Sequence, residues 1–141
     1  MSRIFLDTNF FIHLIEGASP SAARVKYLLR AFSARRDEIL TSVMTLGEVL
    51  VMPIRNRDIA LAQQYRRIFK GPGISVLPFQ EDAAERFAQI RADTKIKPPD
   101  AIQLAVAGSA GCDLFLTNDR RLHSLNIPGI GFITPLDKSP L

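Results

Sequence analysis

The chain has 141 residues, of which 47% are hydrophobic and 23% charged, so we expect one globular domain, residues 1–141, and exclude a disordered chain. Its formal net charge is +4, and residues 1–70 hold 11 basic against 6 acidic residues while residues 71–141 hold 7 against 8. A polyanionic partner should therefore bind mainly the first half.

The first half predicts two short strands and four helices. The β-branched and aromatic run 3–7 predicts a strand that ends at Asp7, followed by a helix from about residue 10 to Glu16 that Gly17 stops. A second helix opens at Ser19 or Ser21 and carries a basic face. Further along lie a minimal strand at 39–40, a helix that Thr41 or Ser42 caps and Pro53 ends, and a helix over about 58–69.

The second half continues the alternation of strands and helices. Strands are predicted at 74–77, 113–117 and 131–134, and helices over about 81–95, 99–110 and 118–122. The helix at 99–110 is apolar nearly all round, so we expect it to be buried. This order predicts an α/β fold with a parallel sheet, in which ligands bind beyond the carboxyl ends of the strands, where Asp7 and Asp119 stand.

A single cysteine, Cys112, excludes an internal disulfide and a cysteine-based zinc site. The apolar run 4–15 is interrupted by Asp7 and is too short to cross a bilayer. We therefore expect a cytoplasmic protein without a membrane partner.

Four acidic residues stand in apolar or small-residue surroundings near the ends of predicted elements: Asp7, Glu48, Asp100 and Asp119. Each has a simpler explanation, because Asp7 could be an N-cap, Glu48 a solvated helix residue, and the other two acids at the start of a helix. Burying an isolated carboxylate is costly, however, and no matching set of buried bases is evident. One shared metal site would explain all four residues together.

Carboxylate ligands favour Mg²⁺ or Mn²⁺ over softer metals. Two such ions about 3.5 to 4 Å apart are a recurrent device for hydrolysing phosphodiesters, because they activate water and offset the charge on the phosphate. Polar residues beside the acids are candidates to orient ligands or waters: Thr8, Asn9, Thr117 and Asn118. The pattern therefore indicates metal-dependent phosphodiester hydrolysis.

Four segments carry a family resemblance: FLDTN at 5–9, LGEV at 46–49, PDAIQLAVA at 99–107 and DLFLTND at 113–119. In this order they resemble the PIN-domain nucleases, particularly the VapC-like toxins of type II toxin-antitoxin systems, over essentially the whole chain. The resemblance implies an α/β/α sandwich with a central parallel sheet of about five strands. It also implies Mg²⁺- or Mn²⁺-dependent cleavage of RNA, a small antitoxin partner and a homodimer.

The resemblance assigns roles to the same residues. Asp7, Glu48, Asp100 and Asp119 fall on the acidic positions of the family, and Thr8, Asn9, Thr117 and Asn118 fall on its accompanying polar positions. Many members place another acid just after the last aspartate, whereas here Arg120, Arg121 and Leu122 follow. This departure affects the second metal position.

Two alternatives stay open. A PIN-like module could bind RNA or a protein without cutting, and metal-dependent turnover would distinguish it from a nuclease. A haloacid-dehalogenase-like phosphatase also places an aspartate at the end of its first strand, but it needs a second aspartate where this chain has Asn9.

Basic residues of the first half are candidates for contacts with RNA phosphates, although each could equally serve solubility alone. They lie on the predicted second helix and in the turn after Pro53: Arg24, Arg30, Arg35, Arg36, Arg55 and Arg57. Residues 49–52 and 53–58 are candidate docking surface for the antitoxin. His13 stands in an apolar run, and we interpret it as a core or interface histidine.

Overall fold

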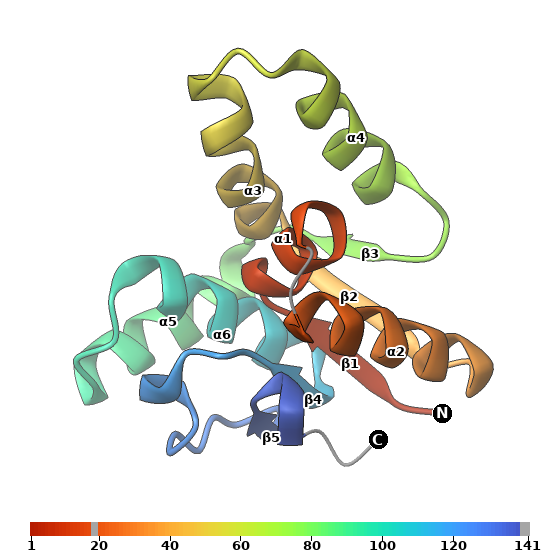
Figure 1. The fold of residues 1–141 in the computed structure, drawn as a ribbon. Helices are drawn as coiled ribbons and strands as arrows, with labels where there is room; N and C mark the ends of the chain where they lie inside the picture. The colour runs from red at the N-terminus through yellow and green to blue at the C-terminus, as the bar shows by residue number, and fades with distance from the viewer. Residues whose placement is uncertain (18–19, 139–141) are drawn as a thin grey trace.

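A computed structural model describes residues 1–17 and 20–138, so the predicted helix cap at Ser19 lies outside the described residues. Five strands form one parallel sheet in the order β3-β2-β1-β4-β5 (Figure 1). They are β1 (Arg3–Leu6), β2 (Glu38–Ser42), β3 (Ser75–Leu77), β4 (Cys112–Leu116) and β5 (Ile130–Thr134). The predicted fold class, with its central parallel sheet of five strands, is confirmed.

Helices cover both faces of the sheet. They are α1 (Thr8–Glu16), α2 (Pro20–Ala34), α3 (Val43–Arg55), α4 (Ile59–Lys70), α5 (Glu81–Asp93) and α6 (Pro98–Ala110). Two short 3₁₀ helices, η1 (Arg120–Leu122) and η2 (Leu136–Lys138), follow β4 and β5. None of the helices among the described residues has the length and apolar character needed to span a membrane.

Alternate residues along the strands divide the interior into two cores. Phe5 of β1 and Phe115 of β4 stack with ring centroids 4.9 Å apart and face α5 and α6. Their neighbours Ile4, Leu6 and Leu114 point to the opposite face and pack against α1, α2 and α4. Because both faces are covered, the central strands β1 and β4 have continuous apolar runs, Ile4 to Leu6 and Leu114 to Leu116, rather than apolar residues alternating with polar ones.

The burial predicted for the helix at 99–110 is confirmed. Ala101, Leu104 and Ala105 of α6 are fully buried. On the same helix, Gly108 lies so close to the loop before β5 that a Cβ on Gly129 would stand 2.1 Å from the Gly108 carbonyl oxygen. This contact, together with a positive φ of 92° at Gly129, admits only glycine there.

The prediction that Pro53 ends its helix is wrong, because α3 continues to Arg55. A proline removes one hydrogen bond, to the carbonyl four residues earlier, and here it stands in the last turn, where few bonds depend on it. The chain closes the helix with bonds from Asn56 N–H to Met52 O at 2.9 Å and from Asp58 N–H to Pro53 O at 2.8 Å. Pro53 is buried and contributes to packing.

The strand order reverses between β1 and β4. From β1 the chain first adds β2 and β3 on one side, and it later adds β4 and β5 on the other. Ligand sites of parallel α/β sheets form beyond the carboxyl ends of the strands at such a point. Asp7 and Thr117 directly follow these two strands, and the Asp7 N–H donates to Leu116 O at 3.2 Å.

Candidate functional site

Asp7 lies at the centre of the site and is only 9% exposed. Its Oδ1 accepts a hydrogen bond from Thr8 N–H at 2.7 Å, so it caps α1, and its Oδ2 accepts one from Thr117 Oγ1 at 2.7 Å. Burial raises the pKa of Asp7, although the hydrogen bonds oppose this shift. The capping interpretation is therefore correct, and the same carboxylate is also an unusually desolvated acid.

A glutamine missed by the sequence analysis donates a hydrogen bond to Asp7. Gln103 of α6 is 1% exposed, and its amide donates to Asp7 Oδ1 at 3.4 Å and to Thr45 Oγ1 at 2.6 Å. Its carbonyl oxygen accepts from the hydroxyl of Ser42. A polar residue in the apolar run of α6, one turn after Asp100, was the available signal. The network ties α6 and the start of α3 to the end of β1.

Glu48 reaches the same place from α3. The residue is exposed, as a solvated helix position would be, but its Oε1 accepts a hydrogen bond from Thr8 Oγ1 at 2.7 Å. Partial burial raises the pKa of Glu48, and repulsion from Asp7 and Asp100 adds to the shift. The carboxylate thus faces the other acids although much of the side chain meets solvent.

Asp100 and Asp119 share one cation, the guanidinium of Arg121. It donates to Asp119 at 2.6 and 3.0 Å and to Asp100 at 3.3 Å. The hydrogen bond from Arg121 holds the pKa of Asp119 below its usual value, whereas burial and then repulsion from Asp119 and Asp7 raise the pKa of Asp100. Arg121 is exposed, so it can leave both carboxylates without disturbing the core.

The predicted polar neighbours separate into two groups. Thr8 and Thr117 contact the acids, and the Thr117 hydroxyl also accepts from the Asp119 N–H at 3.1 Å. Asn118 turns toward η2, where its Oδ1 accepts from Leu136 N–H at 3.2 Å. Asn9 is exposed on the first turn of α1.

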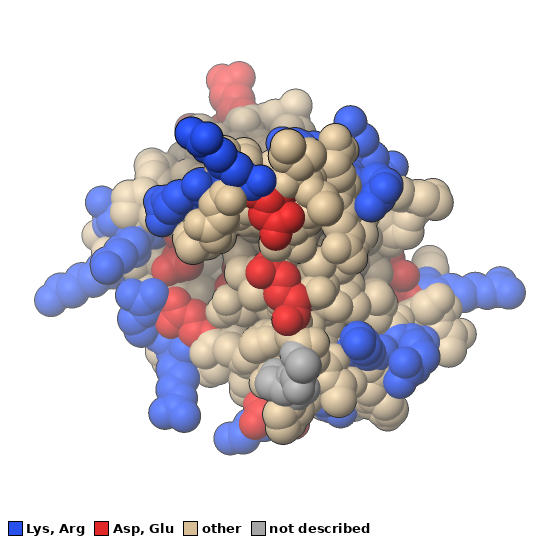
Figure 2. Space-filling model, turned by 45° about the horizontal axis from the view of Figure 1, so that its top comes forward, with Lys and Arg blue, Asp and Glu red and all other residues tan. Residues whose placement is uncertain are grey.

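The basic candidates are also spread over the molecule. Arg24 stands near the start of α2, beside Asn118 and η2. Arg35 and Arg36 lie before β2, near the amino ends of the strands and therefore at the opposite edge of the sheet from Asp7. Figure 2 shows acidic side chains near the middle of one face with Lys and Arg side chains around its rim. The remaining three candidates, Arg30, Arg55 and Arg57, are exposed.

The chemistry of the acidic set fits a hard divalent cation. Its ligand atoms would all be oxygens, and three of the four carboxyls have a pKa raised by burial and by mutual repulsion, which a cation would relieve. Across residues 1–17 and 20–138, no three acidic, histidine or cysteine side chains are already arranged as a metal-binding group. A cation that uses all four acids must therefore displace Arg121 from Asp100 and Asp119.

Residues 4–127 match the family model of the PIN domain. The chain belongs to the PIN domain family. Its central sheet and the reversal between β1 and β4 are thus the PIN fold, and the four acids occupy one end of it. A comparison with curated proteins finds no match.

Several solved structures share this PIN fold. VapBC2 from Rickettsia felis, bound to a promoter DNA fragment, has a TM-score of 0.76 at 16% identity, covering 94% of this chain and 98% of that one. A toxin-antitoxin complex from Klebsiella pneumoniae has a TM-score of 0.70 at 26% identity, covering 90% of this chain and 94% of that one. VapC20 from Mycobacterium tuberculosis is described as a toxin that cleaves the sarcin-ricin loop. It has a TM-score of 0.64 at 20% identity, covering 79% of this chain and 86% of that one. The resemblance to VapC-like PIN proteins is confirmed at this level.

Replacing Asp7 by asparagine should stabilise the metal-free PIN domain at pH 7. The folded-state pKa of Asp7 is raised, so its ionisation costs stability as the pH rises through that pKa, and an amide of the same shape avoids the cost. Thermal melts in EDTA should give a higher Tm for Asp7→Asn, by about 3 °C for each kcal/mol gained. The difference should shrink as the pH falls toward 3.8, the usual value for aspartate. A lower Tm for the variant at pH 7 would contradict this account.

Replacing Arg121 by glutamine should change how strongly a metal stabilises the protein. Without the guanidinium, Asp100 and Asp119 repel each other, so the Tm in EDTA should fall, while Mg²⁺ no longer competes with Arg121. The rise in Tm on adding Mg²⁺ should therefore be larger in Arg121→Gln than in the wild type. Arg120→Gln removes a neighbouring charge and serves as the control. Equal Mg²⁺ effects in all three proteins would refute the competition.

Proposed function

We propose that this PIN-domain protein is a Mg²⁺- or Mn²⁺-dependent endoribonuclease and the toxin of a type II toxin-antitoxin module. The observation that carries the proposal is the convergence of Asp7, Glu48, Asp100 and Asp119, which repel one another and meet beyond the carboxyl ends of β1 and β4. Membership of the PIN family and the likeness to toxin-antitoxin structures support it. The description of VapC20 as cleaving the sarcin-ricin loop supports RNA as substrate.

The residues of the chain would divide the work as follows. Asp7, Glu48, Asp100 and Asp119 would hold the metal through carboxylate oxygens, and a bound divalent ion supplies an activated water and offsets charge on the phosphate. Thr117 and Gln103 keep the Asp7 carboxylate in one orientation, and Thr8 does the same for Glu48. No side chain of the protein becomes covalently attached to the RNA.

The four acids should behave as a single unit in cleavage. Asp7→Asn, Glu48→Gln, Asp100→Asn and Asp119→Asn should each lower kcat by about 100-fold or more, and double variants should lose little beyond this. A labelled single-stranded RNA, incubated with Mg²⁺ or EDTA, provides the assay, and circular dichroism checks the fold. Full activity in folded Asp7→Asn would sink the proposal.

A second candidate is a PIN module that binds RNA or a protein without cutting. One observation favours it, namely that Arg121 already neutralises Asp100 and Asp119. Metal-dependent cleavage in the assay above excludes this candidate, and binding without cleavage supports it. For an active protein, sequencing the new RNA ends after induced expression identifies which RNA is cut.

We further propose that the antitoxin docks on apolar residues at the junction of α3 and α4. Ile54 is 58% and Ile59 74% exposed, and Val51 and Met52 of α3 are also exposed. Val49, by contrast, is buried in the core. Exposed apolar side chains gathered on neighbouring helices mark a surface for a partner. The alternative is that a second copy of the chain covers the same surface in the predicted homodimer.

Ile54→Glu combined with Ile59→Glu should weaken inhibition by the antitoxin by about 10-fold or more and leave RNA cleavage unchanged, because both residues are exposed, Ile54 lies six residues beyond Glu48 and Ile59 is on α4. Phe132→Glu on β5 is a matched control, since Phe132 is also an exposed apolar residue. Inhibition and light scattering should be measured together. If the double variant becomes monomeric but is inhibited normally, the surface belongs to the homodimer instead.

A further inference from the structure

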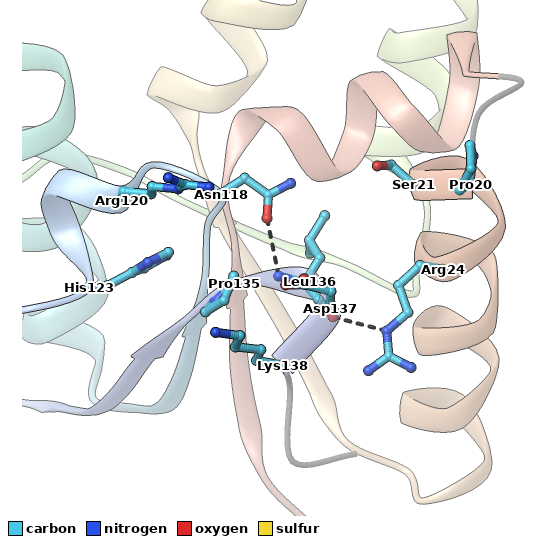
Figure 3. A pocket seen from close by; sticks show the side chains of 10 residues that line it. All are labelled: Pro20, Ser21, Arg24, Asn118, Arg120, His123, Pro135, Leu136, Asp137 and Lys138. Atoms are coloured by element: carbon cyan, nitrogen blue, oxygen red, sulfur yellow. Dashed lines mark hydrogen bonds between the residues drawn. The ribbon is translucent and has the colours of Figure 1, made fainter.

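A hollow lies directly beside the acidic site, and the role of the four acids does not account for it. It encloses about 680 Å³ beyond the ends of β4 and β5 (Figure 3). Asn118 and Arg120, the residues on either side of Asp119, both line it, so it begins within one residue of the proposed metal site. Its other walls come from the start of α2 and from the segment 135–138.

Hydrogen bonds hold these walls in place. Leu136 of η2 is clamped through its backbone, because its N–H donates to Asn118 Oδ1 at 3.2 Å and its carbonyl accepts from Arg24 Nε at 2.9 Å. The ring of His123 lies with Nε2 2.8 Å from Thr117 O. Since a carbonyl oxygen only accepts, Nε2 carries a proton in this bond. The hollow is therefore preformed and tied to Thr117, which also holds Asp7.

The charge of the lining is strongly one-sided. Arg24, Arg120 and Lys138 contribute three fixed positive charges, and Asp137 contributes one negative charge. The first residues of α2, Pro20 and Ser21, also line the hollow, so the positive end of the dipole of α2 adds to the same potential. A site of this composition attracts anions, and neutralised phosphates release counterions.

We infer that this hollow binds the backbone of the RNA next to the bond that is cut, with a flanking phosphate held by Arg120 and Lys138. The inference rests on the proposed ribonuclease function and names the path of its substrate. Asn118 and Arg120 flank Asp119 and line the hollow, so a phosphodiester chain lying in it reaches the acidic site from a side where three cations outnumber the one carboxylate, Asp137. The site recognises the backbone and so does not itself select a base sequence.

The protein offers a matched control pair that does not line this hollow, Arg30 in α2 and Arg36 just after that helix. Arg24 lies near the start of α2, whereas Arg36 follows its end and lines a different hollow together with Asp37, Glu38 and Ser75. Because Glu38 and Ser75 begin β2 and β3, that hollow is at the amino ends of the strands, away from Asp7. Arg30 and Arg36 are both exposed, like Arg120 and Lys138.

The test compares two double variants that each remove two positive charges. The first combines Arg120→Gln and Lys138→Gln, and the second, the control, combines Arg30→Gln and Arg36→Gln. Each is made in the wild type and in an inactive Asp100→Asn background, and binding of a labelled single-stranded RNA is measured by anisotropy at several salt concentrations. The first pair should weaken binding and reduce the slope of log K against log salt by about 0.7 for each phosphate that is no longer neutralised. In the active background it should raise KM more than it lowers kcat. The second pair should leave both nearly unchanged.

The outcomes separate the two proposals. If the wild type cleaves RNA but the two double variants bind and cleave alike, the hollow is not the RNA path and the nuclease assignment stands. If the Arg120 and Lys138 pair impairs only binding of the antitoxin, the hollow serves a protein and the inference is overturned. If the parent protein neither binds nor cuts RNA, both proposals fall. All four replaced side chains are exposed, so loss of folding does not obscure the comparison.

Discussion

The burial of one carboxylate, Asp7, is the constraint around which the site is organised. The end of β1 is the centre of a parallel sheet, so any side chain there is surrounded by apolar strands and helices. An acid in that position costs stability unless donors surround it, and Thr8, Thr117 and Gln103 supply them. These donors orient the carboxylate but do not cancel its charge. A cation bound beside Asp7 would stabilise the negative charge that remains.

Arg121 shows how the chain neutralises part of the negative charge of the site by itself. It pairs with Asp119 and Asp100 only, and the pKa values of Asp7, Glu48 and Asp100 stay raised. The neutralisation is therefore incomplete and reversible, because an exposed ion pair is weak and readily exchanged. An acid at this position would have added charge to the site, whereas arginine lowers it. Where the resemblance leads one to expect another acid just after Asp119, Arg121 thus lowers the negative charge of the site.

Sequence patterns were informative wherever they reported on periodicity or on a charge in apolar surroundings. The strands, the buried character of α6 and the grouping of Asp7 with Thr117 followed from such patterns. The extent of α3 did not, because the cost of Pro53 depends on its place in the helix. The pairing of Arg121 and the turning of Asn118 toward Leu136 were beyond reach, since each depends on which side chain is nearest in space. Gln103 gave a signal, as a polar residue in an apolar run, but its partner Asp7 did not follow from that signal. The roles of the acids and of the basic residues remain predictions.

The hydrogen bonds around Asp7 join residues that are far apart along the chain. Gln103 is separated from Asp7 by 96 residues and Thr117 by 110. A contact of such high separation cannot form before the later residue has been synthesised, and closing so long a loop costs entropy. On a ribosome, where the N-terminal part emerges first, β1 and α1 therefore wait for β4 before Asp7 acquires its support. A nascent or truncated chain that ends before β4 lacks both Thr117 and Asp119, so the complete acidic centre belongs only to a nearly finished polypeptide.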